Sequence, residues 1–413
     1  MITNLPQFIK SFTYGKLSLL KLSMMLLCLL LLASDTSMAQ SITWQRTLNN
    51  RFGGVSKVLQ APDGGFLSFG GEVEDSPNLH YTTWIQKFSV FGDTAWKKII
   101  DERNFFCTWA EHTFDHGYIL CGFINDGNSQ SSDIYLYKTD SSGNKQWSIV
   151  LYGGDDIDQG YCVKPTPDSG YIVIGRIENL NSDVGIFKTN KNGIIEWSKV
   201  FINNSYSQMP EEVIVLADGY IIAGATIYAI NNADVLLMRI NSMGDSLWTK
   251  NIGGSKLDYG YSIDFGNEGG YMVGGVSNSF NEQENRETYV VHTDTLGNVI
   301  WQKTYKGFSD DYCYRIRRKP NLGYVLVGSG DSVGVLYSKA KIRVINEEGT
   351  LHKESSFVPG NDENEFMSVE TTLDGGYIIG GQSKSIFGVK QMYIVKADSN
   401  LSAIPIGILS QHL

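Results

Sequence analysis

A tryptophan recurs along this chain at a nearly constant interval, in most copies after a glycine-containing turn, as in the stretch KTDSSGNKQW at 138–147. The copies are Trp44, Trp96, Trp147, Trp197, Trp248 and Trp301, with Lys353 in the seventh position, at intervals of 52, 51, 50, 51, 53 and 52 residues. A second marker, a glycine followed by an aromatic residue, begins at Gly65, Gly117, Gly170, Gly219, Gly270, Gly323 and Gly376. Two markers with one period predict seven copies of a single structural unit.

Each unit has the pattern of four short β-strands, which we label a to d in chain order. The best examples are strand a at 261–265, strand b directly after the glycine marker, strand c at 133–139 and strand d at 145–152. These runs are rich in β-branched and aromatic residues and are bounded by Gly, Asn, Asp and Ser, which is the signal of strands joined by tight turns. No long segment has an apolar period of 3.6 residues, so we expect almost no helix.

Seven four-stranded antiparallel units predict an all-β, seven-bladed β-propeller, because radial repetition leaves only short, protected sheet edges. One blade more or fewer is the nearest alternative. The seventh unit has a strand c at 391–397, but Leu401 replaces its turn glycine and Pro405 stands in its tryptophan position. Proline would interrupt a paired strand. The segment 42–48 resembles a strand d with no strand c before it, so we expect this N-terminal strand to close the ring beside 391–397.

The first 39 residues have the layout of a secretory signal peptide. Three lysines precede the apolar run 22–33, and Ser37, Met38 and Ala39 form a small-x-small cleavage site before Gln40. The apolar run is too short for a comfortable membrane span. We therefore expect residues 1–39 to be removed and residues 40–413 to form one propeller domain with no membrane insertion after cleavage.

Charge and cysteine content exclude several classes of partner. The whole chain carries a formal charge of −10, which disfavours nucleic acid and anionic membrane surfaces. Four cysteines follow the leader, and Cys107 and Cys121 flank one predicted hairpin. A disulfide between these two is open, although buried thiols acting as small apolar side chains are the simpler interpretation. The cysteine spacings do not match a zinc or thioredoxin-like site.

The repeat pattern DGGY…KTDSxGN…W resembles secreted bacterial β-propeller repeat proteins that often occur with type IX sorting domains. The resemblance covers residues 41 to about 400. It implies a propeller exported by a Gram-negative bacterium, in the periplasm, at the outer cell surface or secreted, and it implies no particular activity. The turn with its tryptophan is also similar to quinoprotein propeller repeats, but no cofactor is expected.

The connections from strand d to strand a contain the first candidate ligand-binding residues. Asp158, Asp258, Asp311 and Asn364 occupy one repeated position near the predicted channel. A ring of such groups suits a divalent cation or a hydroxylated ligand such as a sugar. The alternative, which repetition in register favours, is that each side chain caps backbone N–H groups in its own blade. No metal site is predicted.

Arg315 is the remaining candidate ligand-binding residue. It lies with Arg317 on one face of a predicted strand a, the innermost strand of its blade. An arginine there either binds a ligand or pairs with a carboxylate, and the neighbours Asp310 and Asp311 are the expected partners.

We therefore expect an exported, non-enzymatic, monomeric propeller that binds protein or carbohydrate outside the cytoplasm. No catalytic residues are predicted, because the chain has no nucleophile elbow, no phosphate loop and no convincing nucleophile–base pair. Two alternatives remain open: a propeller enzyme, either a lyase or a hydrolase, acting on glycans at the channel mouth, and a structural component of the cell surface.

Overall fold

The computed structural model describes residues 42–48, 53–74, 80–100, 102, 104–125, 131–178, 181–307, 309–319, 323–331, 338–359, 363–384 and 390–403. The predicted signal peptide therefore lies outside the described residues, as does Pro405. Within the described ranges, no helix is long and apolar enough to cross a membrane.

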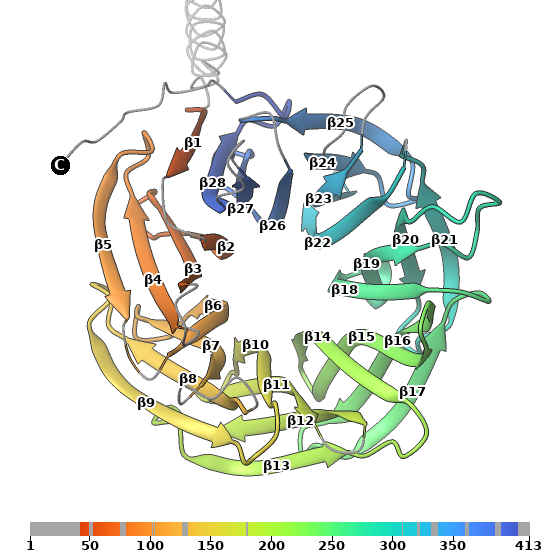
Figure 1. Cartoon of the computed structure of the whole chain (residues 1–413), viewed down its shortest axis with the longest axis horizontal. Coiled ribbons are helices and arrows are strands. Elements are labelled where there is room, and N and C mark those ends of the chain that lie inside the picture. Colours follow the sequence, from red (N-terminus) through yellow and green to blue (C-terminus); the bar gives the residue numbers. More distant parts are fainter. Residues whose placement is uncertain are drawn as a thin grey trace, which may run out of the picture. The chain divides into compact units, whose positions relative to one another are not determined.

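The described strands form seven four-stranded antiparallel sheets, arranged as the blades of a ring (Figure 1). Blade 1 contains β2 (Gly53–Gln60), β3 (Phe66–Glu74), β4 (His80–Phe88) and β5 (Thr94–Ile100). Blade 2 contains β6 (Phe106–His112), β7 (Tyr118–Ile124), β8 (Asp133–Thr139) and β9 (Lys145–Tyr152). Blade 3 contains β10 (Gln159–Pro165), β11 (Tyr171–Glu178), β12 (Ser182–Thr189) and β13 (Ile195–Phe201). Blade 4 contains β14 (Ser207–Leu216), β15 (Gly219–Ala229), β16 (Asn232–Asn241) and β17 (Ser246–Ile252).

The other three blades repeat this order. Blade 5 contains β18 (Asp258–Phe265), the 3-10 helix η1 (Asn267–Gly269), β19 (Tyr271–Ser277), β20 (Glu287–Thr293) and β21 (Val299–Tyr305). Blade 6 contains β22 (Asp311–Lys319), β23 (Gly323–Gly330), β24 (Lys339–Ile345) and β25 (Leu351–Phe357). Blade 7 contains β26 (Asn364–Thr371), β27 (Tyr377–Lys384), β28 (Lys390–Ala397) and β1 (Trp44–Leu48).

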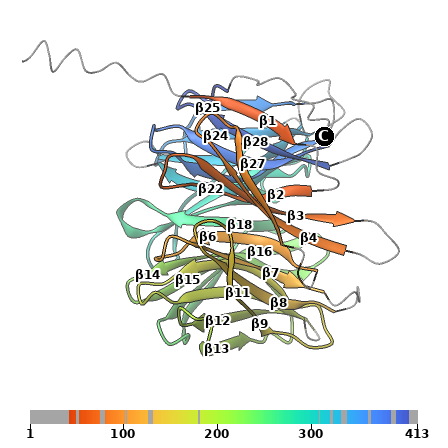
Figure 2. The ribbon, with the colours of Figure 1, turned by 90° about the vertical axis from the view of Figure 1, so that its left-hand side faces the viewer.

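The ring is closed by the N-terminal strand, as the sequence predicted. β1 pairs antiparallel with β28, with Trp44 opposite Lys396 and Leu48 opposite Met392, and the view turned by 90° shows the two strands together (Figure 2). Blade 7 is thus built from both ends of the propeller. This pairing covers the edge of β28, which would otherwise be exposed.

The repeated tryptophan packs against the turn glycine of the next blade. A β-carbon added to Gly92 would lie 2.6 Å from the Trp44 ring, and one added to Gly193 would lie 2.8 Å from the Trp147 ring. These glycines also have a positive φ, +82° at Gly92 and +79° at Gly193, which other residues rarely adopt. The motif therefore combines a tight turn with a contact between blades.

One contact of this kind is replaced, between blades 6 and 7. Lys353 occupies the tryptophan position of β25, and Leu401 occupies the turn-glycine position of blade 7. Leu401 keeps the turn conformation with a φ of +65° and is buried. The two substitutions are complementary, because the leucine side chain needs space that a tryptophan ring would fill.

A second repeated contact is an ion pair inside five of the blades. A carboxylate of the a–b turn contacts a buried cation of strand c at 2.5–2.9 Å in the pairs Asp63–Lys87, Asp115–Lys138, Asp168–Lys188, Asp218–Arg239 and Asp374–Lys396. The cation is largely shielded from water, so its carboxylate partner offsets the cost of burial.

The four cysteines of the described chain are free and buried. In the β6–β7 hairpin, Cys107 lies opposite Gly122 and Cys121 lies opposite Trp109, so the two thiols are not cross-strand partners. Their interpretation as small apolar core residues agrees with this placement.

We predict that deleting residues 41–48 destabilises the whole propeller and does not merely fray one end. The deletion exposes the edge of β28 and removes Trp44, a fully buried ring whose loss alone costs about 3–5 kcal/mol. Thermal unfolding followed by circular dichroism should show one cooperative transition at a much lower temperature. Ile42→Ala, at a half-exposed position before β1, is the matched control and should melt like the parent chain. A deletion variant that keeps the parent melting temperature contradicts the closure.

Candidate functional site

Every innermost strand has a β-bulge at the same position. The unpaired residues are Ser56, Thr108, Tyr161, Glu211, Tyr261, Tyr314 and Met367, on β2, β6, β10, β14, β18, β22 and β26. A bulge bends its strand and redirects the side chain at that point. Each innermost strand therefore has one set of side chains at or before its bulge and another set after it, nearer the end of the strand.

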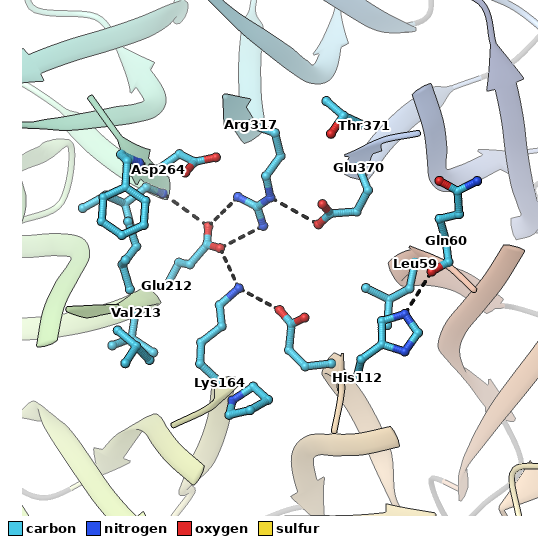
Figure 3. A pocket seen from close by; sticks show the side chains of 16 residues that line it. Leu59, Gln60, His112, Lys164, Glu212, Val213, Asp264, Arg317, Glu370 and Thr371 are labelled. Carbon is cyan, nitrogen blue, oxygen red and sulfur yellow. Dashed lines mark hydrogen bonds and ion pairs between the residues drawn. The ribbon is translucent and has the colours of Figure 1, made fainter. Parts of the chain in front are cut away.

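After the bulges, six charged side chains form a closed ring of ion pairs across the channel, which we call the charged belt. Its members are Lys57, Glu111, Lys164, Glu212, Arg317 and Glu370. In ring order the contacts are Lys57–Glu370 at 2.5 Å, Glu370–Arg317 at 3.2 Å, Arg317–Glu212 at 2.8 Å, Glu212–Lys164 at 3.5 Å, Lys164–Glu111 at 2.7 Å and Glu111–Lys57 at 3.8 Å. Positive and negative groups alternate, so every charge has an opposite charge on both sides. Figure 3 shows the arc of the belt from Glu370 through Arg317 and Glu212 to Lys164.

Trp109 lies against two lysines of this belt and against Arg315, which is outside the belt. Its ring centroid is 4.3 Å from the Arg315 guanidinium, 4.6 Å from the Lys164 ammonium and 4.8 Å from the Lys57 ammonium. Its indole N–H donates to Glu111 at 2.9 Å. Cations are attracted to the face of an indole, most strongly where water is excluded, and Trp109 is fully buried.

The belt and Trp109 separate two cavities at the ends of the channel. The polar mouth, where the innermost strands end, is a cavity of about 560 Å³ lined by residues such as Gln60, His112, Asp264 and Thr371 (Figure 3). The opposite cavity, where these strands begin, has about 390 Å³ and includes Phe106, Tyr161 and Glu211. The two cavities share no lining residue.

The carboxylates of the belt are held in the ionised state. Burial alone would raise the pKa of Glu111, but the ammonium groups of Lys164 and Lys57 lower it to about 2. Burial likewise opposes ionisation of Glu212, and the guanidinium groups of Arg317 and Arg315 overcome it and lower its pKa. Because these groups are ionised and paired, they are poor proton donors at neutral pH.

Aromatic residues gather where the strands begin, and we call this region the aromatic mouth. Phe106 and Tyr161 line the cavity itself. Tyr259, Tyr261, Tyr312 and Tyr314 lie next to it, because the Tyr259 hydroxyl donates to the cavity residue Glu211 at 2.8 Å. On β18 and β22 four tyrosine rings are in contact: Tyr259 and Tyr261 at 4.6 Å, Tyr261 and Tyr314 at 5.5 Å, and Tyr314 and Tyr312 at 5.6 Å between centroids. Phe106 contacts Tyr81 at 5.6 Å and Phe123 at 5.4 Å. All of these rings are partly exposed.

Glu211 is the only acidic residue at the seven bulge positions. Burial raises its pKa to about 7, although the Tyr259 hydroxyl donates to it at 2.8 Å and Arg315 lies nearby. A carboxyl group with this pKa is present in both protonation states near neutrality, so it can donate or accept a hydrogen bond to a ligand.

Two of the predicted aspartates accept backbone N–H groups. Asp158 accepts the N–H of Glu178 in its own blade at 3.0 Å. Asp258 accepts the N–H of Gly254 at 2.7 Å and the hydroxyl of Ser279 at 2.6 Å. Both side chains are buried at the starts of β10 and β18, where they stabilise local turns.

Asp311 and Asn364 differ from these two. Asp311, which is fully buried, pairs with Lys341 at 2.7 Å and with Arg343 at 2.9 Å, both on β24 of its own blade. The capping interpretation is therefore wrong for Asp311. Asn364 is buried at the start of β26. Within the described part of the chain, no group of three or more potential His, Cys, Asp or Glu ligands is positioned to hold a metal ion.

Arg315 reaches the channel, but its expected partners were wrong. It pairs with Glu212 of β14 at 3.2 Å, and its neighbour Arg317 pairs with Glu212 and Glu370. Asp311 is already engaged on β24, and the propeller brings more distant carboxylates to the axis. Sequence reasoning missed the belt, although a signal was present: the positions six residues before the glycine marker include Glu111, Lys164, Asp264, Arg317 and Glu370.

Comparison with known proteins supports the fold and no finer assignment. No model of a known protein family matches the chain, and no curated protein matches its sequence. The β-propeller domain of the Trilobed protease from Pyrococcus furiosus is similar in structure, with a TM-score of 0.51 and 9% identity over 88% of this chain and 100% of that one. That domain is described as having an open velcro topology, whereas β1 closes the ring here.

A polysaccharide lyase, Uly1, is also similar in structure. Its TM-score is 0.50 and its identity 8%, over 84% of this chain and 90% of that one. At such low identity both neighbours show a shared β-propeller architecture, which hosts many unrelated functions.

We predict that Glu212→Gln destabilises the propeller by about 3–5 kcal/mol, because it leaves the buried guanidinium of Arg317 without its main partner. Urea unfolding measures this loss. Glu363→Gln is the matched control: its pair with Lys384 is exposed on both sides, so it should change stability by about 1 kcal/mol or less. Equal effects of the two substitutions would show that the belt contributes no more than a surface ion pair.

We predict a loss of stability in acid that depends on the belt. The folded pKa of Glu111 is about 2 and its ordinary value is 4.5, and the pKa values of Glu212 and Glu370 are also lowered. A lowered pKa stabilises the fold above the unfolded value, so this contribution disappears as the pH falls from about 4.5 towards 2. Free energies of unfolding measured across this range should fall steeply in the parent chain and less steeply in Glu212→Gln. If the free energies of unfolding of the two proteins fall in parallel with pH, the belt carboxylates are not the source of the acid sensitivity.

Proposed function

We propose that this β-propeller binds a carbohydrate at its aromatic mouth and does not cleave it. The observation that carries the proposal is the wall of partly exposed tyrosine rings, from Tyr259 to Tyr312, beside a concave cavity of about 390 Å³. Small-molecule sites are typically clefts of about 300–1,000 Å³ with aromatic walls and a few placed polar groups.

The chemistry of the mouth suits a sugar ring. Tyrosines offer an apolar face for the C–H side of a pyranose and a hydroxyl for its polar edge. Glu211, Gln382 and Arg315 line the adjoining cavity and provide a carboxyl group, an amide and a cation. A concave site of this size favours a saccharide over the broad surface that a protein partner needs.

The polar mouth is a weaker candidate, although its cavity is larger. The charged groups beneath it are engaged with one another in the belt, and His112 contacts the Gln60 carbonyl at 3.0 Å. A ligand there would compete with these existing contacts. At the aromatic mouth a ligand can stack on the tyrosine rings without displacing an existing contact, because these residues are partly exposed.

A glycan lyase or hydrolase is the second candidate, and Glu211 is the observation that favours it. A carboxyl group with a pKa of about 7 can transfer protons at neutral pH. Hydrolysis generally requires two carboxyl groups with complementary roles. The belt carboxylates next to the mouth are already ion-paired with buried lysines and arginines, so they are not free to act as the second one. Binding without cleavage is therefore the better-supported function.

The proposal places this activity outside the cytoplasm. The predicted signal peptide at 1–39 and the resemblance to exported bacterial propellers support it, and the acidic mature chain suits a soluble monomer that binds a neutral glycan. A structural role at the cell surface would need no open aromatic cavity, which is why we favour ligand binding.

A glycan array probed with residues 40–413, followed by calorimetry on the best ligand, tests the function. Tyr261→Ala removes the ring at the centre of the tyrosine wall and should weaken binding at least about tenfold, or about 1.4 kcal/mol. Phe91→Ala is the control, because this exposed ring lies in the c–d turn of blade 1 and should leave affinity unchanged. A pull-down with residues 40–413 as bait, which tests for a protein partner, is run in parallel.

Glu211→Gln separates binding from catalysis. If the propeller only binds, the amide preserves much of the hydrogen bonding and the ligand remains intact. If it is an enzyme, the parent chain shortens the glycan and Glu211→Gln does not. A protein partner whose capture depends on Tyr261, with no array signal, would overturn the carbohydrate proposal.

A further inference from the structure

The junction between blades 6 and 7 contains a third cavity, which we call the junction pocket. It has about 480 Å³ and is lined by Lys319, Gly323, Val344, Asn346, Glu347, Glu348, His352, Lys353, Tyr377, Ser399 and Asn400. It shares no lining residue with the aromatic mouth, so it is a separate site.

This pocket arises where the repeated tryptophan is missing. At other junctions the tryptophan ring contacts the marker aromatic residue of the next blade, for example Trp147 with Tyr171 at 6.1 Å and Trp197 with Tyr220 at 6.2 Å between centroids. Tyr377 is the corresponding residue of blade 7, and Lys353 stands where its tryptophan partner would be. The ring of Tyr377 therefore borders space that an aromatic side chain fills elsewhere.

The cross-strand pair is also reversed in blade 6. In blade 2, Lys138 of strand c lies opposite Trp147 of strand d. In blade 6, Val344 of strand c lies opposite Lys353 of strand d. In blade 6 the cation is therefore on strand d and the apolar residue is on strand c. Val344 gives the pocket an apolar wall, and Lys353 places a positive charge at its rim.

Lys319 places a buried ammonium group in this pocket without a carboxylate. Only 8% of the residue is exposed. Its ammonium donates to the Gly375 carbonyl at 2.8 Å and to the Tyr377 hydroxyl at 3.0 Å, which leaves one of its three donors. Within the described ranges neither Lys319 nor Lys353 forms an ion pair, whereas the buried cations of five other blades contact a turn aspartate at 2.5–2.9 Å.

The electrostatics agree with this geometry. Burial lowers the pKa of Lys319, and the like charge of Lys353 lowers it further. Three acidic groups lie nearby. Asp374 pairs with Lys396 at 2.8 Å, Glu347 approaches Arg318 at 3.9 Å, and Glu348, which also lines the pocket, is exposed to solvent. An uncompensated buried cation is costly, and a bound anion would remove that cost.

We propose that the junction pocket binds a small aromatic carboxylate. The carboxylate contacts the ammonium groups of Lys319 and Lys353, and the ring occupies the position of the missing tryptophan against Tyr377 and Val344. The ligand thus supplies both groups that the repeat provides elsewhere, the aromatic ring and the anion.

Calorimetry with indole-3-acetate on residues 40–413 tests this proposal, and indole-3-acetamide is the uncharged control. We expect the acid to bind and the amide to bind at least tenfold more weakly. Lys319→Met should weaken binding of the acid at least tenfold while keeping or raising the melting temperature, because it removes an unpaired buried charge. Lys98→Met, at an exposed lysine of β5, should bind like the parent chain.

The double variant Lys353→Trp with Leu401→Gly restores the repeat and is an independent test. The indole should fill the pocket, abolish binding of the acid and leave the protein folded, whereas Tyr261→Ala should leave binding unchanged. Absence of binding by the parent chain, equal binding of acid and amide, or full binding by the double variant would each overturn the proposal.

Discussion

The contact between the tryptophan of one blade and the turn glycine of the next is the constraint on which this propeller depends. A β-carbon at Gly92 or Gly193 would meet the ring of Trp44 or Trp147 within 3 Å, so ring and turn must change together. The contact links every tight c–d turn to the packing of the neighbouring blade. Where it is replaced, by Lys353 and Leu401, both members change and a pocket opens beside them.

The charged belt imposes a different constraint, because removing one partner of a buried ion pair leaves an uncompensated charge at a high cost in stability. Glu212 contacts three cations. One is Lys164 on β10 of blade 3, and the other two are Arg315 and Arg317 on β22 of blade 6. The belt therefore requires the blades to meet at one geometry, and closure by β1 helps to provide it. The same network holds its carboxylates ionised and separates the two mouths of the channel, which leaves ligand recognition to the groups at the channel ends.

The seven bulges connect this framework to the proposed function. Each bulge redirects one side chain, and the residue type at that position varies freely, from Ser56 to Tyr261 and Glu211. A structural element that recurs in each blade thus positions side chains that do not recur. Such a division allows the scaffold to stay constant while the mouth acquires the aromatic and acidic groups that suit a saccharide.

The sequence by itself determined the blade count, the four strands of each blade and the closing role of 42–48, because turn glycines, strand periodicity and a missing partner strand are local signals. It also placed Arg315 near the axis. Only the tertiary structure decided that Arg315 pairs with Glu212, which is 103 positions away, and that the tyrosines of β18 and β22 form one wall. These contacts join different blades, and a repeat pattern specifies where a blade begins and ends without specifying which side chains meet across the ring.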